Sequence, residues 1–168
     1  VVERSDALSM ANTVKDNIRT RRVAILMGPD GAADAKALKT ALQREGAVVK
    51  VIAPLMPPPG EGEVPVDHGL MTTSSVLFDA IAVIGRRPWD RLPDARDFIS
   101  DAYRHCKAIA LLGDAQGLLQ DWGLTEDADP PGVVVASNAK SIAKPFVAAI
   151  AAHRWWEREV DPITGTRN

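Results

Sequence analysis

The chain has 168 residues, of which 46% are hydrophobic, and its 20 basic and 22 acidic residues give a formal net charge of −2. This length and composition suit one globular domain with a substantial core. Near-zero net charge gives no electrostatic reason to expect nucleic acid as a partner, and no apolar run approaches the roughly 20 residues that would span a membrane. The single cysteine excludes an intrachain disulfide, and we expect a cytoplasmic location.

The first half of the chain alternates between strand and helix patterns. Residues 1–20 are polar and lack periodicity, so we expect a linker or extended tail there; because the chain begins with Val, we interpret it as a fragment of a longer protein. The uninterrupted apolar run 23–27 predicts a strand covered on both faces. Residues 29–46 then predict a helix that Gly46 ends, and 47–54 predict a second strand.

The middle of the chain breaks this rhythm. Residues 54–77 hold five prolines and three glycines, so we expect an irregular excursion with a short strand near 64–66. The remaining elements follow in chain order: a strand over 78–85, an amphipathic helix over 94–106, strands over 108–113 and 132–137, a helix over 141–159 and a tail over 161–168. Pro145 is compatible with the last helix only in its first turn.

Alternation of strands and helices predicts parallel pairing through right-handed crossovers. We therefore expect an α/β fold over 21–160: a three-layer, doubly wound, mainly parallel five-stranded sheet of flavodoxin-like type with strand order 2-1-3-4-5. Ligands of such folds bind beyond the carboxyl ends of the strands, where the strand order reverses. The predicted ligand cleft is formed by these residues: Gly28, Asp30, Arg86, Arg87 and Asp114. The two arginines either bind an anion or pair with Asp90 and Asp94.

The motifs that usually mark catalytic or metal sites are missing. No phosphate-binding glycine motif is present, and the turn after the fourth strand offers Gly113 and Asp114 where a nucleophile would stand. We place Cys106 on the apolar face of a helix, where burial leaves a thiol inert. The three histidines, His68, His105 and His153, do not form a metal-binding pair, so we expect no metal site. The aromatic patch of His153, Trp155 and Trp156 either packs the terminal segment or contacts another domain or subunit.

Three segments carry a family resemblance. "FDAIAVIG", "AYRHCKAIALLGDA" and "AAHRWWE" resemble the C-terminal domain of large-subunit heme catalases, over about residues 20–160. That domain is similar to the class I glutamine amidotransferase-like superfamily, whose cysteine elbow has the form A-I-C-H-G. Laid on "ALLGDA", the nucleophile falls on Gly113 and the histidine on Asp114. The family's acidic residue falls on Ala33, and its oxyanion turn becomes Gly85-Arg86, so we expect no catalytic residue.

The resemblance implies a non-catalytic accessory domain of a catalase that dismutates hydrogen peroxide. Heme would then reside in the rest of that protein, with no cofactor in this chain, and the partners would be the catalase core and the other subunits of a homotetramer. Two alternatives stay open: a chaperone-like domain that protects unfolding client proteins, and a residual amidotransferase or hydrolase that uses Asp114 or Cys106. Asp114 also has a structural interpretation, as the cap of a short helix over 115–122.

Overall fold

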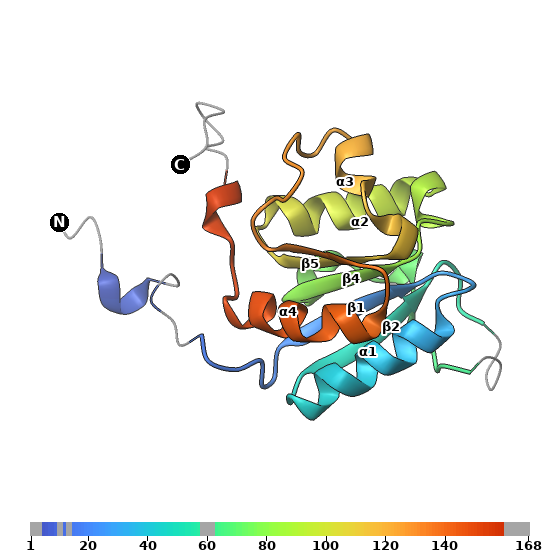
Figure 1. Ribbon diagram of the computed structural model, residues 1–168, viewed down its shortest axis with the longest axis horizontal. Coiled ribbons are helices and arrows are strands. Elements are labelled where there is room, and N and C mark those ends of the chain that lie inside the picture. Colours follow the sequence, from blue (N-terminus) through green and yellow to red (C-terminus); the bar gives the residue numbers. More distant parts are fainter. Residues whose placement is uncertain (1–4, 10–11, 13–14, 58–62, 160–168) are drawn as a thin grey trace.

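The computed structural model describes residues 5–9, 12, 15–57 and 63–159 of the chain. Six parallel strands form one sheet in the order β3-β2-β1-β4-β5-β6. The strands are β1 (Arg22–Met27), β2 (Val48–Ala53), β3 (His68–Gly69), β4 (Ala80–Ile84), β5 (Ala108–Leu112) and β6 (Val133–Ala136). The helices are α1 (Ala32–Arg44), α2 (Pro93–Arg104), α3 (Leu118–Asp121) and α4 (Ala139–Ala151). Figure 1 shows α1 and α4 on one face of the sheet and α2 and α3 on the other.

The strands are apolar throughout because helices cover both faces of the sheet. Every residue of β4 and β5 is buried, as the uninterrupted apolar runs predict. One core lies between the sheet and the α1–α4 layer and includes Phe146. The second core lies on the α2–α3 side and includes Trp89, which with Phe146 is among the largest fully buried side chains. The flavodoxin-like three-layer architecture is confirmed.

The strand count differs from the prediction by one edge strand. Without β3 the order reads 2-1-4-5-6, which is the predicted crossover pattern. β3 pairs with the end of β2 over only two residues, at His68–Gly69 and not near 64–66. Asp67 fixes this pairing, because its Oδ2 accepts a hydrogen bond from the backbone N–H of Val51 at 2.8 Å. A two-residue strand has no alternation of side chains that a sequence pattern could reveal.

The last helix is shorter than predicted, and Pro145 does not lie in its first turn. Asn138 caps α4 by accepting a hydrogen bond from the N–H of Ser141, and the helix ends at Ala151. Pro145 is therefore the seventh helical residue. Both Pro145 and Ser141 are exposed, so water can bind the Ser141 carbonyl that lacks a donor at Pro145. Beyond the helix, His153 adopts a positive φ of 71° that redirects the chain.

The N-terminal segment contacts the domain through its last residues. Ile18 is 1% exposed and packs in the α1–α4 core, and the N–H of Thr20 donates to the carbonyl of Gly46. The predicted tail over 161–168 lies outside the described residues. Within the described ranges, we find no helix that has both the length and the apolar character needed to cross a membrane.

Candidate functional site

A cleft of about 300 Å³ lies at the carboxyl ends of β1, β4 and β5, where the strand order reverses. All five residues that the sequence predicted for a ligand cleft line it: Gly28, Asp30, Arg86, Arg87 and Asp114. The loops that carry these residues are far apart in sequence and meet because parallel strands end at the same edge of the sheet.

The two glycines of the turn after β1 are required by close packing. A Cβ at Gly28 would lie 2.5 Å from the backbone oxygen of Arg87, and one at Gly31 would lie 2.9 Å from Cγ2 of Ile84. Both positions therefore need glycine so that the end of β4 and the loop after it can approach the β1–α1 turn. Packing accounts for the "GPDG" sequence without a bound phosphate.

The turn after β5 has the backbone shape of a nucleophile elbow, with glycine at its apex. Gly113 adopts a φ of +64°, and a Cβ at this position would meet no atom within 4 Å. A strained strand-to-helix turn of this kind exposes the nucleophile in α/β hydrolases. Here the apex position carries no side chain that could attack a substrate.

Asp114 joins two loops and does not cap a helix. Its Oδ1 accepts a hydrogen bond from the backbone N–H of Arg86 at 2.7 Å. The cap position of α3 belongs to Gly117, whose φ of 85° separates Asp114 from that helix. The predicted capping role is therefore wrong, because the chain turns once more before α3 begins.

Ala33, which the sequence predicted to stand at the superfamily's acidic position, and its neighbour Asp34 have different surroundings. Ala33 is exposed and lines a neighbouring hollow together with Leu55 and Val64. Asp34 lines the cleft itself, and its Oδ1 accepts a hydrogen bond from the N–H of Ala139 at 2.8 Å. Ala139 is the first residue of α4, so Asp34 ties the start of that helix to α1.

Arg86 is engaged by two carboxylates. Its Nη2 lies 2.6 Å from Oδ2 of Asp121, and its Nε lies 3.6 Å from Oδ2 of Asp90. The hydrogen bond to Asp121 is the main reason why the pKa of Arg86 is raised. This favours ion pairing over anion binding for Arg86, although the second partner is Asp121 and not the predicted Asp94. Arg87 has no carboxylate within 4 Å in the described part of the chain.

The histidines and the cysteine lie at separate places. His68 is in β3, His105 ends α2, and His153 follows α4. Among residues 5–9, 12, 15–57 and 63–159, no three His, Cys, Asp or Glu side chains group so that they could hold a metal ion. Cys106 is buried, but it follows α2 with a φ of 56° and does not lie on the helix face as predicted. Burial raises the pKa of the Cys106 thiol, against a smaller opposite effect of Arg158.

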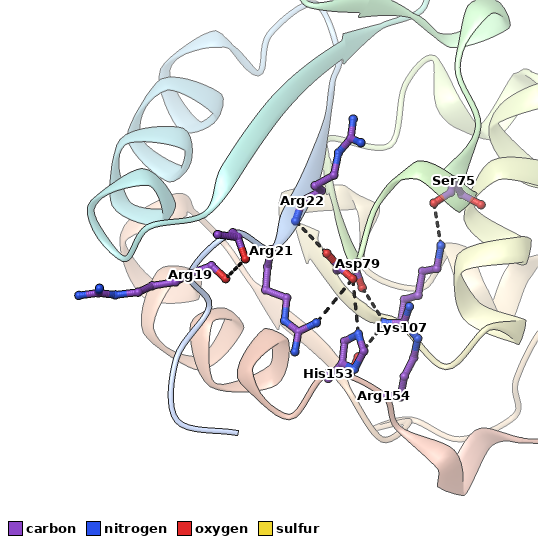
Figure 2. Close-up of polar contacts among 9 residues, drawn as sticks. Arg19, Arg21, Arg22, Ser75, Asp79, Lys107, His153 and Arg154 are labelled. Carbon is purple, nitrogen blue, oxygen red and sulfur yellow. Dashed lines mark hydrogen bonds and ion pairs between the residues drawn. The ribbon is translucent and has the colours of Figure 1, made fainter. Parts of the chain in front are cut away.

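A second polar cluster, which sequence reasoning missed, surrounds Asp79 at the amino ends of the strands, opposite the cleft (Figure 2). Asp79 Oδ2 accepts a hydrogen bond from the N–H of Arg22 at 2.9 Å. Its Oδ1 lies 3.4 Å from Nε2 of His153 and 3.8 Å from Nη1 of Arg21. Asp79 thus connects the starts of β1 and β4 to the segment that follows α4.

Two buried cations lie near that C-terminal segment, and one of them, Arg158, belongs to it. Lys107 is 3% exposed and donates to the carbonyl of Ser75 at 2.7 Å, and burial is the main cause that lowers its pKa to about 8. Arg158 is equally buried, lies 4.6 Å from the centroid of the Tyr103 ring and donates to the Lys107 carbonyl. Burial also lowers the pKa of Arg158 to about 10.

The two tryptophans of the predicted aromatic patch differ. Trp155 packs against the α1–α4 core, and its Nε1 donates to the carbonyl of Ala149 at 3.2 Å. Trp156 remains 36% exposed. Packing of the terminal segment therefore explains Trp155 and leaves Trp156 on the surface.

Comparisons with known proteins agree on one family. A family model described as the C-terminal domain found in long catalases matches residues 19–160. Catalase HPII of Pseudomonas aeruginosa is 37% identical over 164 residues, covering 92% of this chain and 23% of that protein. Catalase HPII of Mycobacterium avium is 34% identical (95% and 26%), and Catalase-2 of Bacillus subtilis is 36% identical (93% and 23%). The chain spans about a quarter of the length of these curated relatives.

Proposed function

Because this chain belongs to the family of C-terminal domains found in long catalases, we propose that it is a non-catalytic accessory domain of a cytoplasmic heme catalase. In this role the domain stabilises the parent tetramer, and it contributes to the path by which hydrogen peroxide reaches the heme. Added interface area stabilises an assembly because it binds the folded state and not the unfolded one.

The geometry of the elbow carries the non-catalytic part of this proposal. Acyl-transfer chemistry needs a nucleophile, a base within hydrogen-bond reach and donors for the oxyanion. Gly113 occupies the apex, and the neighbouring Asp114 carboxylate is bound to the Arg86 backbone. The buried thiol of Cys106, whose pKa is raised, lies beside Lys107 at the amino end of β5, at the opposite end of the strand from the cleft. These contacts give no support to the amidotransferase or hydrolase alternative.

We place the heme in the remainder of the longer protein. Tyrosine is the axial ligand of heme iron in catalases. The only tyrosine of this chain, Tyr103, is 6% exposed, and its ring lies beneath the guanidinium of Arg158. This environment does not fit a heme site, because the ring is already covered.

The test uses the longer protein with and without residues 19–160. We expect both forms to dismutate peroxide, with the shortened form showing a lower Tm, a weaker tetramer by sedimentation and an altered KM for peroxide. If the shortened protein has the same Tm, the same tetramer stability and the same KM for peroxide as the longer protein, the accessory role is contradicted. Peroxide dismutation by the 168-residue chain alone would contradict its non-catalytic assignment.

One surface favours chaperone-like activity as a second candidate function. Three flexible apolar side chains are strongly exposed near the β3 edge: Leu55 (74%), Met56 (54%) and Met71 (76%). Methionine-rich surfaces adapt to varied apolar partners. We expect the chain to suppress aggregation of a heat-unfolding client, and the triple change of these residues to Ser to abolish the effect. The control is Val48→Ser, which changes an exposed apolar residue at the start of β2. Equal suppression of aggregation by the unchanged chain, the triple variant and the control would exclude this surface as the client-binding site.

A further inference from the structure

A hollow of about 340 Å³ lies at the amino end of β5, at the opposite end of that strand from the cleft. Three basic side chains line it: Arg104, Lys107 and Arg154. Within the described ranges, none of the three has a carboxylate oxygen within 4 Å. Glu159, which is exposed, is the one acidic residue among the described residues that line the hollow. This basic hollow, as we call it, therefore has an excess of positive charge.

A backbone contact brings two of these cations together. Lys107 and Arg154 pair in an isolated antiparallel β-bridge, and Figure 2 shows both side chains beside the Asp79 cluster. The residues that precede them, Cys106 and His153, have positive φ values of 56° and 71°. Non-glycine residues keep such a conformation only where the surrounding contacts hold it, and they cluster at functional sites. The fold thus accepts backbone strain on both sides of the bridge that places the two cations.

The charge of Lys107 is buried without a counter-ion in contact. Lys107 is 3% exposed, and its Nζ donates to the carbonyl of Ser75, which is a neutral acceptor. Burial, followed by the positive charge of Arg154, lowers the pKa of Lys107 to about 8. The carboxylates of Asp79 and Asp101 favour its protonated form, but both act from more than 4 Å away. Negative charge in the hollow would stabilise this buried ammonium group.

A fourth cation adjoins the hollow from the interior. Arg158 is also 3% exposed and donates to the Lys107 carbonyl. In the part of the chain that the structure describes, its Nε and Nη1 have no hydrogen-bond partner and no carboxylate lies within 4 Å of it. Burying a charge is costly unless an opposite charge or several hydrogen bonds compensate it. The positive field of Arg158 therefore adds to that of the side chains that line the hollow.

We propose that the basic hollow binds a small organic anion, with the oxyanion group at Lys107 and Arg154 and an apolar body against Val76 and Trp156. Both apolar side chains line the hollow, and they are 72% and 36% exposed. The indole of Trp156 offers a face on which a planar group can stack. Sites for small molecules combine apolar walls with a few polar groups and begin at about 300 Å³. The ligand class is therefore a carboxylate or phosphate monoester that carries an aromatic group.

The shape of the hollow distinguishes this class from other anions. An inorganic ion would leave the apolar wall in contact with water, which costs free energy in proportion to the exposed area. Nucleic acids bind to basic groups that follow the phosphates along a surface, whereas these cations converge on one hollow of a chain with a formal net charge of −2. The proposal concerns this chain's own residues and does not depend on its role in a catalase.

The test is a titration of the 168-residue chain with phenyl phosphate at fixed ionic strength, followed by proton–nitrogen NMR. We expect saturable shifts of the Trp156 indole N–H and of the Lys107 and Arg154 amides, with a Kd of about 1 mM or lower. Inorganic phosphate and phenol should each bind at least about tenfold more weakly, because each lacks one half of the contacts. The proposal is overturned if either binds as tightly as phenyl phosphate. It is also overturned if the shifts map elsewhere or do not saturate by about 10 mM.

Four variants locate the charges that bind the anion. Arg154→Gln and Lys107→Met should each weaken phenyl phosphate binding about tenfold, because each removes a charged donor. Glu159→Gln should tighten it about threefold, because it removes the repulsion of like charge. Lys36→Met is the matched control, since Lys36 is an exposed cation on α1, and it should leave Kd unchanged.

Circular dichroism checks that each variant is folded. Glu159→Gln changes an exposed residue and so gives an independent readout if Lys107→Met does not fold. An unchanged Kd in both Arg154→Gln and Glu159→Gln would contradict the proposed site, and so would an equal loss of affinity in Lys36→Met.

Discussion

The Asp114 carboxylate accepts a hydrogen bond from the Arg86 backbone N–H at 2.7 Å, and this contact joins the turns that follow β5 and β4. Both turns pass through a glycine with positive φ, Gly113 at 64° and Gly85 at 72°. Asp114, which the sequence predicted to stand where a histidine occurs in the amidotransferase-like superfamily, thus holds the mouth of the cleft in shape.

Replacing Asp114 by Ala should reduce the free energy of unfolding by about 1 kcal/mol, because the Arg86 N–H loses a charged acceptor at a partly solvated site. Urea denaturation measures the change. The control is Asp30→Ala, since Asp30 lines the same cleft and accepts no hydrogen bond from the described residues. If the two variants unfold at the same urea concentration, the contact does not stabilise the fold.

Gly132 and Gly123 form a matched pair for a packing prediction. Both have positive φ, 74° and 69°, but a Cβ at Gly132 would overlap ring atoms of Trp155, whereas one at Gly123 would meet nothing within 4 Å. Gly123→Ala should cost about 1 kcal/mol of strain, and Gly132→Ala about 1–3 kcal/mol more through displacement of the indole. Equal midpoints in guanidinium denaturation would show that Trp155 moves without cost.

Lys107 predicts a stability change at alkaline pH. Its pKa is lowered to about 8 in the folded protein from an ordinary value of 10.5, so between these values the unfolded state binds more protons. Stability should therefore rise with pH across this window, by a few kcal/mol at most. Lys107→Met removes this contribution, whereas Lys36→Met, at an exposed position on α1, should retain it. Parallel pH profiles of all three proteins would contradict the prediction.

Asp34 predicts a link between two helices that are distant in sequence. Its carboxylate accepts a hydrogen bond from Ala139 at the start of α4, 105 residues away. Asp34→Ala should cost about 1 kcal/mol and increase hydrogen exchange at the first turn of α4. Lys36→Ala on the same helix is the control. Unchanged exchange at Ala139 would mean that Asn138 alone caps the helix.

The crossover pattern and the cleft could be predicted because they depend on patterns along the chain. Uninterrupted apolar runs identify strands that are buried on both faces, and parallel pairing brings the turns after β1, β4 and β5 together. The same reasoning gave the residues of the cleft, such as Asp30 and Arg87. The sequence pattern did not predict the ion-pair partners of these residues. The pairing of Arg86 with Asp121 depends on the paths of two loops of different length, which the pattern does not determine.

The cluster around Asp79 had no such signal. Its contacts join residues from the starts of β1 and β4 and from beyond α4, which are 57 or more positions apart. The end of α4 was overestimated for a related reason. Apolar spacing continues past Ala151, but the positive φ of His153 ends the helix, and only tertiary contacts hold a non-glycine residue in that conformation.

The segment 153–159 determines where the domain can be truncated or joined to a fusion partner at its C-terminal side. The N–H of Trp155 donates to the carbonyl of Cys106, and the backbones of Arg154 and Lys107 pair in an isolated antiparallel β-bridge. The Arg158 side chain donates to the Lys107 carbonyl. A chain that stopped after α4 would leave the start of β5 without these donors and would expose the Tyr103 ring. A tag or fusion partner should therefore follow Glu159 and not α4, because the last secondary element of the fold is not the end of its stabilising contacts.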